Sequence, residues 1–419
     1  MLRFFTYLTL FSAIAQPAAL FPRFRMTERM FFVLACLTIV MFAIDRLMHG
    51  AALSRLPQRK YVYGLVVVYV LSIAQSGWLG GAVDMLLLWS KIAIVFTLVV
   101  DGSESVRDVR RLAITVVAAV AALSWMGWDL YLNSPELLHD SGRLESVGNY
   151  NLSNSFALAL TIGTAFAVAV LTTAHGFLGK LFWLLPVCGF AVTCVYTKSR
   201  GGNLGLAVVI VGSILLTPSI RSRAFKGLLL AGVIVAMIAS VPLILARGDV
   251  SGYFGGDVSA GDRMMVWQAG VLMILDNPLF GVGYGQFADR VVDYGSDRKM
   301  LAHNTILSVA AETGIVGGVF FVAMIVTTLW SLWRVWRLAL RDTAQQDLAC
   351  LAQGVMVGLV AFLVNSSFSV KDYDPMFWAL LGTAGSIIVV HNRLSREIPA
   401  GPGSPADDAA AGSLALGSR

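Results

Sequence analysis

The stretch LSNSFALALTIGTAFAVAVLTTA, residues 152–174, contains no Asp, Glu, Lys or Arg. An α-helix needs about 20 mostly apolar residues to cross the hydrocarbon core of a bilayer. This stretch has that length, and comparable segments recur along most of the chain. It therefore predicts a transmembrane helix, and the recurrence predicts a chain that crosses a membrane many times.

The composition of the 419-residue chain points the same way. Hydrophobic residues make up 57% of it and charged residues 13%, whereas a soluble domain carries about a quarter charged residues. The net charge of +6 calls for no nucleic-acid partner, because membrane topology places basic residues in short loops. The four cysteines lie in or beside apolar segments without metal-ligand spacing, which is typical of small buried apolar residues.

We predict an all-α integral membrane protein with about 12 transmembrane helices, within a range of 10 to 12, and one large, partly helical extracytoplasmic loop. The first apolar run resembles a signal peptide, but further spans follow at once, so we expect an uncleaved helix. The expected spans lie near residues 4–22, 28–45, 61–79, 82–100, 112–131, 152–174, 179–197, 202–218, 227–246, 313–333, 347–367 and 375–392.

Lys and Arg are enriched in cytoplasmic loops, so their distribution predicts the orientation. If both termini are cytoplasmic, the inner loops hold most of the basic residues, with Arg23 and Arg25 as an exception. We therefore expect a bacterial inner-membrane protein with residues 247–312 in the periplasm. The predicted regions are an N-terminal transmembrane region (1–246, about nine helices), a catalytic loop (247–312), a C-terminal transmembrane region (313–393, about three helices) and a disordered cytoplasmic tail (394–419).

The 247–312 loop gathers most of the polar residues that could carry chemistry. Arg263 and Trp267 are four residues apart and would share one face of a helix that runs to Leu275. Asn277-Pro278 would end that helix, and Gly281-Val282-Gly283-Tyr284-Gly285 would form a turn. A packed surface helix with an ordinary turn is the alternative interpretation.

His303 is the one histidine in this loop, and an imidazole can take up a proton near neutral pH. Asn304 follows it directly, and Glu312 lies nine residues later. A purely structural histidine is the alternative. No cluster has zinc-ligand spacing and no Asp-x-Asp pair occurs in the 247–312 loop, so we expect chemistry without a metal or a cofactor.

Arg200 stands at a predicted helix boundary beside two glycines. Its guanidinium suits bidentate contact with phosphate. Alternatively, Arg200 and Lys198 only reach out to lipid head groups. Lys91 is an isolated charge in the apolar run 85–100 and could pair with a lipid phosphate or with Asp84.

The order of these motifs resembles the O-antigen ligase / Wzy polymerase superfamily of membrane glycosyltransferases, with a GT-C-like fold. The resemblance rests on Ser199-Arg200-Gly201, Asp262-Arg263 with Trp267, Asn277-Pro278-Leu279-Phe280-Gly281, His303-Asn304 and Glu312. Gly148-Asn149-Tyr150-Asn151 resembles the Gly-Asn-Pro-Asn element of that family, with Tyr150 in place of proline.

The resemblance implies a donor glycan on undecaprenyl diphosphate and transfer to an acceptor hydroxyl, either on lipid A-core or on a growing glycan chain. It implies that Arg200 and Arg263 hold the diphosphate and that His303 acts as the base or positions the acceptor. Further expected substrate-binding residues are Asn151, Trp267, Asn304 and Glu312. We expect inversion at the anomeric carbon, because no carboxylate pair indicates a covalent intermediate.

Two forms of the reaction remain open, a ligase and a repeat-unit polymerase, and the Arg/His pattern slightly favours the ligase. A transporter or flippase for a lipid-linked glycan or a small anion is the alternative function, because the span count fits it equally well. Transporters carry charged or broken helices near the midplane, where Lys91 is the only candidate. A non-catalytic assembly scaffold is the third possibility.

Overall fold

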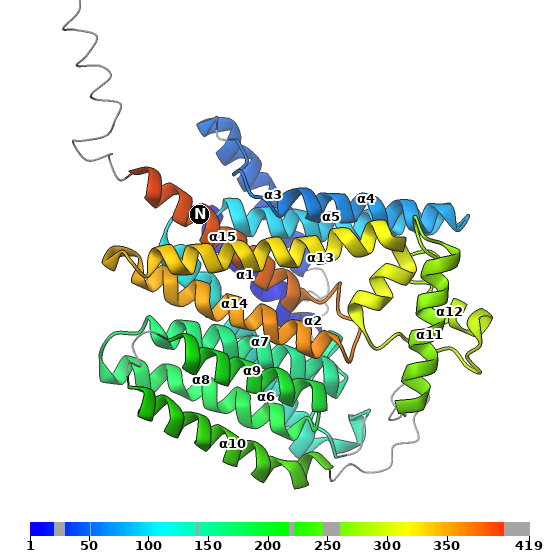
Figure 1. The fold of residues 1–419 in the computed structure, drawn as a ribbon. Coiled ribbons are helices and arrows are strands. Elements are labelled where there is room, and N and C mark those ends of the chain that lie inside the picture. Colours follow the sequence, from blue (N-terminus) through cyan, green and yellow to red (C-terminus); the bar gives the residue numbers. More distant parts are fainter. Residues whose placement is uncertain (21–29, 51, 140–141, 218–221, 246–259, 398–419) are drawn as a thin grey trace, which may run out of the picture.

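The computed structural model describes residues 1–20, 30–50, 52–139, 142–217, 222–245 and 260–397. In this part of the chain every regular element is a helix, and no strand occurs (Figure 1). The predicted all-α fold is therefore confirmed. Residues 247–259 of the predicted loop, most of the predicted tail, and Arg23 and Arg25 lie outside the described residues.

The long helices lie side by side, while α11 crosses one end of the bundle (Figure 1). The helices are α1 (Leu2–Ala15), α2 (Pro17–Leu20), α3 (Met30–His49), α4 (Arg59–Gln75), α5 (Leu79–Asp101), α6 (Val106–Asn133), α7 (Ser153–Thr172), α8 (Gly176–Tyr196), α9 (Arg200–Leu216), α10 (Arg223–Leu245), α11 (Ala260–Asp276), α12 (Phe287–Arg290), α13 (Thr305–Ala339), α14 (Gln346–Ser366) and α15 (Pro375–Glu397). The short 3₁₀ helices include η2 (Pro135–Leu137), η3 (Gly148–Tyr150), η4 (Val291–Tyr294) and η5 (Thr343–Gln345).

Nine helices among the described residues are long and apolar enough to cross a membrane. They are α3, α5, α6, α7, α8, α10, α13, α14 and α15. The shorter helices α1, α4 and α9 pack along them: α1 against α6, α4 against α5 and α9 against α14. The chain is thus a multi-pass membrane protein, and the total of about 12 spans stays a prediction.

The centre of the bundle is formed by α7, α14 and α15, whose residues are mostly buried. In contrast, α10 lies at the edge of the bundle (Figure 1) and buries none of its apolar window. Exposed apolar surface of this extent requires lipid as its solvent. The position of α10 therefore agrees with a membrane environment around the bundle.

Small residues let the central helices approach closely. A Cβ atom added to Gly202 of α9 would lie 2.3 Å from the Cβ of Ala157 on α7. A Cβ added to Gly354 of α14 would lie 2.4 Å from the Cβ of Ala169, also on α7. Close packing against α7 thus fixes the positions of α9 and α14, the two helices that border the candidate site.

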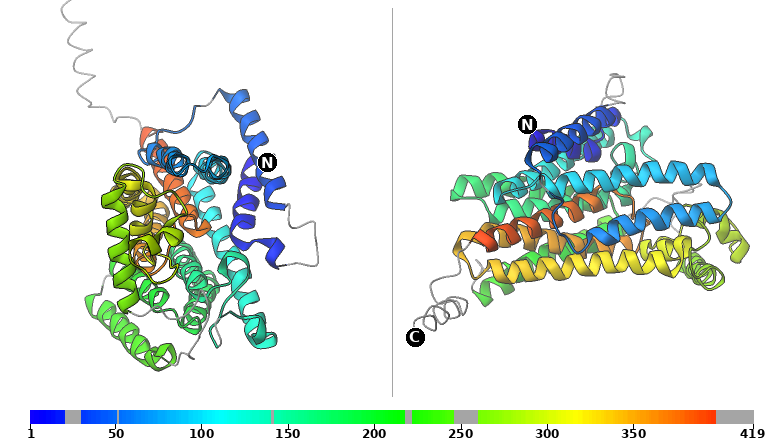
Figure 2. Two further views of the ribbon diagram at one scale, coloured as in Figure 1. Left: turned by 90° about the vertical axis from the view of Figure 1, so that its right-hand side faces the viewer. Right: turned by 90° about the horizontal axis from the view of Figure 1, so that it is seen from above.

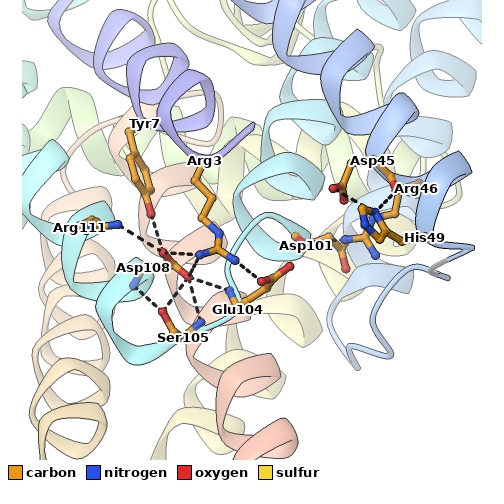
Figure 3. Close-up of polar contacts among 10 residues, drawn as sticks. All are labelled: Arg3, Tyr7, Asp45, Arg46, His49, Asp101, Glu104, Ser105, Asp108 and Arg111. Atoms are coloured by element: carbon orange, nitrogen blue, oxygen red, sulfur yellow. Dashed lines mark hydrogen bonds and ion pairs between the residues drawn. The ribbon is translucent and has the colours of Figure 1, made fainter. Parts of the chain in front are cut away.

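We call the end of the bundle with the α14–α15 connection the site end, and the end with the α5–α6 connection the opposite end. At the opposite end, the Ser105 and Asp108 side chains form a capping box at the start of α6, as Figure 3 shows. Arg3 of α1 bonds to Asp108 and to Glu104. These contacts bind the first helix to the α5–α6 connection.

Asp101 is a deeply buried charge at the opposite end. Its carboxylate accepts from Arg59 at 2.6 Å and from the Ser54 backbone N–H at 2.8 Å. The guanidinium of Arg46 donates to the Asp101 carbonyl oxygen at 2.7 Å. Asp101 therefore ties together α3, α4 and α5.

We predict that Asp101→Ala lowers the free energy of unfolding by about 3–5 kcal/mol, because it leaves Arg59 as an uncompensated, largely buried charge. Asp45→Ala is the matched control, because Asp45 pairs only with His49 on the exposed surface and should change stability by less than about 1 kcal/mol. Equilibrium unfolding of the purified protein in detergent measures both. Equal losses in the two variants would contradict the role of Asp101.

Candidate active site

The amphipathic α11 lies across the site end, at a steep angle to the spanning helices (Figure 1). It contains Arg263 and Trp267 and ends at Asp276, directly before Asn277-Pro278. The predicted helix is therefore confirmed. Its inner face joins a small apolar core with neighbouring segments, namely Val266, Ala269, Met273, Phe287, Val291, Met300, Ala302 and Ala311.

Trp267 ties α11 to the segment that precedes α13. Its indole N–H donates to the Ala302 carbonyl oxygen at 2.9 Å, while 37% of the residue stays exposed. The residue after Ala302 is His303. Trp267 thus fixes the position of α11 relative to His303 and still offers part of its ring to a ligand.

The helix α13 is broken at Gly314, whose φ of 71° and ψ of −174° are not helical. The break frees carbonyl groups that must find other partners. The Val282 N–H donates to the Ala311 carbonyl at 3.0 Å, and the Gly283 N–H donates to the Glu312 carbonyl at 3.1 Å. The glycine turn after α11 thus completes the hydrogen bonding of the broken helix.

The predicted turn at residues 281–285 is present, and all three of its glycines have positive φ. Gly281 lies so close to α13 that an added Cβ would be 2.3 Å from the carbonyl carbon of Glu312. Only glycine tolerates both the left-handed backbone and this approach. The sequence Gly-Val-Gly-Tyr-Gly is therefore required by packing against the break in α13.

The Glu312 side chain is buried and points back into the same turn. Its carboxylate accepts from the Phe287 N–H at 3.1 Å and also from the Gly285 N–H. The Ser72 hydroxyl donates to the Glu312 carbonyl oxygen at 2.5 Å. These contacts connect the turn to α4, so Glu312 organises the loop. The predicted contact of Glu312 with substrate remains a prediction.

His303 has φ 48°, a conformation that costs a non-glycine residue about 1–3 kcal/mol and clusters at active sites. Directly after it, the Asn304 side chain accepts from the Leu307 N–H at 3.0 Å and caps α13. Asn304 therefore has a structural contact, and its expected contact with substrate stays a prediction. The cap fixes where α13 begins and thus where His303 stands.

The His303 ring is half-buried, and one ring N–H donates to the backbone carbonyl of Phe368 in the α14–α15 connection. Burial, and next the positive charge of Arg263, lower the pKa of His303 below its usual 6.5, while the Phe368 bond raises it in part. The imidazole is therefore neutral at pH 7. Its second ring nitrogen can then accept a proton.

Arg200 is the first residue of α9 and is exposed. The Ser199 side chain caps this helix by accepting from the Gly202 N–H at 3.2 Å, and Lys198 before it has φ 53°. An added Cβ on Gly201 would be 3.1 Å from the Phe368 ring. One residue of the α14–α15 connection thus contacts both the Arg200 segment and His303.

The two arginines have no hydrogen-bond or ion-pair partner in the described part of the chain. Arg200 is exposed, and the Nε atom of Arg263 is buried without a partner. Other cations of the outer segment are paired, such as Lys299 with Asp289 and Arg298 with Asp262. Two uncompensated guanidinium groups beside one neutral imidazole are suited to an anionic ligand.

The α14–α15 connection, residues 367–374, was not among the predicted site segments, yet it holds the site together. Thr305 at the start of α13 donates to the Ser369 carbonyl at 2.7 Å and accepts from the Lys371 N–H at 3.0 Å. The Lys371 ammonium is buried and donates to the Ser155 hydroxyl on α7 at 2.5 Å. The connection therefore joins α7, α13 and α14 just behind His303.

The carboxylates of this connection are buried as well. Asp372 accepts from the Tyr284 hydroxyl at 2.9 Å, and burial raises the pKa of Asp372 to about 6. Asp374 accepts from the Met376 N–H at 2.9 Å, at the start of α15. The signal in the sequence was Lys371-Asp372-Tyr373-Asp374 before Pro375, a charged run in an otherwise apolar region.

Asn151 is exposed and directly follows η3, two residues before the start of α7. Its neighbour Tyr150 is fully buried beside Asp374. Burial raises the pKa of Tyr150, and the charge of Asp374 raises it further. The Asn149 N–H donates to the side-chain oxygen of Gln16 at 3.0 Å. This element therefore anchors the start of α7 near the α14–α15 connection, and the role of Asn151 in binding substrate stays a prediction.

We predict that Gly314→Ala destabilises the protein by more than about 1 kcal/mol, because the native φ is positive and the added Cβ would lie 2.4 Å from Leu279 backbone atoms. Gly232→Ala in α10 is the control. It has open space around it and should be neutral or slightly stabilising. Thermal unfolding in detergent compares the two, and an unchanged midpoint for Gly314→Ala would contradict the packing described for the turn.

Comparison with known proteins locates a family match over this region. Residues 184–322 match the model of the family Wzy_C, described as O-antigen ligase. The matched region begins in α8, ends in α13 and includes Arg200, Arg263 and His303.

The chain is also 24% identical over 280 residues to the exopolysaccharide production protein ExoQ of Rhizobium meliloti (strain 1021). That alignment covers 62% of this chain and 63% of ExoQ, so it spans a little less than two thirds of the relative. With the family match over the site segment, this likeness shows that the chain fits the O-antigen ligase / Wzy superfamily, as the order of its motifs predicts.

Proposed function

We propose that this protein is a membrane glycosyltransferase that transfers a glycan from undecaprenyl diphosphate to an acceptor hydroxyl in the synthesis of a surface polysaccharide. The observation that carries the proposal is the pair of uncompensated guanidinium groups, Arg200 and Arg263, at the same end of the bundle as a neutral His303. A diphosphate at the membrane surface matches both their charge and their geometry.

In the proposed reaction the acceptor oxygen attacks the anomeric carbon of the donor sugar. The bond between that carbon and the diphosphate oxygen breaks, and its electron pair leaves with the diphosphate. The free ring nitrogen of His303 takes the acceptor proton. Arg200 and Arg263 stabilise the charge that develops on the leaving diphosphate, so the glycan is transferred with inversion.

Breaking the bond to a diphosphate supplies the driving force, so the proposed reaction requires no nucleotide. The bond from His303 to the Phe368 carbonyl holds one nitrogen protonated and directs the other toward the substrate. Burial keeps the ring neutral. The ring is therefore prepared as a base before the substrate binds.

Of the two forms of the reaction, the likeness to an exopolysaccharide production protein favours transfer onto a growing glycan chain over transfer to lipid A-core. The family description, O-antigen ligase, favours the other form. In both forms the donor and the chemistry at His303 are the same. Product length separates them, because a polymerase yields a ladder of repeats and a ligase yields single additions.

We further propose that the site end faces the periplasm and that both termini are cytoplasmic, in a bacterial inner membrane. The opposite end carries clustered basic residues, such as Arg107, Arg110 and Arg111 at the start of α6. Cytoplasmic loops are enriched in Lys and Arg. In this orientation the glycan is joined where the finished polysaccharide is needed.

We predict that Arg200→Ala and Arg263→Ala each lower kcat about 10²–10³-fold, the loss seen when one group that stabilises transition-state charge is removed. His303→Ala should lower it about 10²–10⁴-fold. The assay follows release of undecaprenyl diphosphate by the reconstituted protein from a lipid-linked oligosaccharide.

Lys299→Ala serves as the control for these variants, because Lys299 carries the same charge in the same outer segment but pairs with Asp289 on the surface. It should retain wild-type turnover. Normal turnover by all three site variants would refute the residue roles. If the wild-type protein released no undecaprenyl diphosphate with any acceptor, the proposed reaction would be refuted. A transporter or a scaffold would then be the remaining functions.

The pH dependence tests the state of His303. Because the neutral ring is the base and its pKa lies below 6.5, kcat/KM should stay constant above neutral pH and fall only at a pH below 6.5. Arg263→Gln removes the charge that lowers this pKa, so the residual activity should fall at a higher pH, closer to 6.5. The profile of Lys299→Gln should match the wild type, and an identical profile for Arg263→Gln would argue against His303 as the titrating group.

A further inference from the structure

Lys91 lies 12 residues after the start of α5, about 18 Å along the helix axis. From the sequence alone this depth corresponds to the interior of the membrane. The structure brings Lys91 together with Gln16, Asn149 and Tyr373, which lie at the site end, around one pocket. Trp89, two residues earlier, contacts the ring of Tyr284 in the outer turn and that of Trp378 in the first turn of α15.

Lys91 opens onto a pocket of about 540 Å³ between α1, α5 and α15, which we call the Lys91 pocket. Its mouth includes polar groups of the site end, from Gln16, Asn149 and Tyr373. Its deeper wall is apolar and follows one face of α5 to Val99, about 12 Å below Lys91. The pocket thus has a polar entrance with one cation and an apolar interior.

The Lys91 side chain is exposed, and no hydrogen bond or ion pair engages its ammonium group within the described residues. The predicted pair with Asp84 is not formed. A lysine within an apolar helix is costly unless it meets an anion or water. An exposed ammonium above an apolar wall, close to polar groups of the site end, is complementary to a phosphate that is joined to a hydrocarbon chain.

The position of the pocket mouth indicates which lipid would bind there. Tyr373 and Pro375 line it. Tyr373 belongs to the connection whose Phe368 carbonyl accepts from His303, and Pro375 directly follows that connection. Gly201, which follows Arg200, packs on the Phe368 ring of the same connection, and the charge of Arg263 acts on His303, which bonds to Phe368. The α14–α15 connection therefore has one cationic site on α5 and another formed by the two arginines.

We propose that the Lys91 pocket binds the phosphate and the first chain segment of a second lipid-linked substrate, the glycan acceptor, with Lys91 as the counter-charge. A volume of about 540 Å³ is in the range of small-molecule sites, which suits a head group and the start of a chain. The identification of this lipid as the glycan acceptor rests on the proposed function, in which a polymerase joins two lipid-linked glycans. The binding of an anionic lipid to the pocket does not rest on that function.

The test measures binding without turnover. Heptaprenyl phosphate is titrated into the full-length Arg200→Ala/Arg263→Ala variant in neutral detergent, and bound lipid is counted by native mass spectrometry. One equivalent should bind. Adding Lys91→Gln to this variant should weaken the binding of heptaprenyl phosphate about tenfold or more, the loss expected when a charged partner is removed. Adding Lys91→Arg instead should retain the binding.

Lys180→Gln is the matched control, because Lys180 is an exposed lysine near the start of α8 at the opposite end; it should leave binding unchanged. Uncharged heptaprenol and inorganic phosphate should each bind at least about tenfold more weakly than heptaprenyl phosphate. Equal binding of heptaprenyl phosphate by Lys91→Gln overturns the site. Equal competition by phosphatidylglycerol overturns the named occupant and makes the pocket a general site for anionic lipids.

Because no turnover is needed, a failed transfer reaction and a failed Lys91 site give different results. If the wild-type protein releases no undecaprenyl diphosphate but Lys91-dependent binding is intact, the proposed reaction is wrong and the pocket stands. If release is normal and Lys91→Gln binds heptaprenyl phosphate as well as its parent does, the pocket is wrong and the reaction stands.

Discussion

The arrangement of the site end depends on the hydrogen bond from the His303 ring to the Phe368 carbonyl. This bond joins the start of α13 to the α14–α15 connection, and the Phe368 ring packs on Gly201 beside Arg200. Residues that are distant in the chain thus meet around one residue with no reactive group of its own. A carbonyl also fixes which imidazole nitrogen carries the proton, so one contact sets both the position and the chemical state of the ring.

The contact is rigid because the surrounding polar groups are satisfied internally. In a membrane protein an unpaired backbone group costs several kcal/mol, yet α13 is broken at Gly314 close to the site. The glycine turn after α11 takes up the freed carbonyl groups, and Glu312 accepts N–H groups from the same segment. The break therefore fixes the outer loop to the bundle.

The distribution of charge separates structural from functional ionic groups. At the opposite end Asp101 pairs with Arg59, and Arg3 pairs with Asp108 (Figure 3), so these charges connect helices. At the site end Arg200, Arg263 and Lys91 have no such partner within the described residues. The views in Figure 2 show α1 and α3 at one side of the bundle, and the Lys91 pocket is lined by α1, α5 and α15. Cations left unpaired in this way are suited to ligands that carry phosphate.

The sequence by itself determined the class of fold, most helix positions and the likeness to the O-antigen ligase family, because apolar length and the order of polar motifs are local properties of the chain. It also identified the helix that carries Arg263 and the turn at residues 281–285. It did not reveal the α14–α15 connection, because Lys371, Asp372 and Asp374 belong to no motif and contact partners that are distant in the chain, such as Ser155, Tyr284 and Tyr150. It singled out Lys91 as an isolated charge in an apolar run, but it did not reveal the pocket that Lys91 lines, because the other lining residues, on α1, α15 and the α14–α15 connection, are distant in the chain. Which of the many charges are paired, and which stay available to a ligand, was decided only when the helices packed.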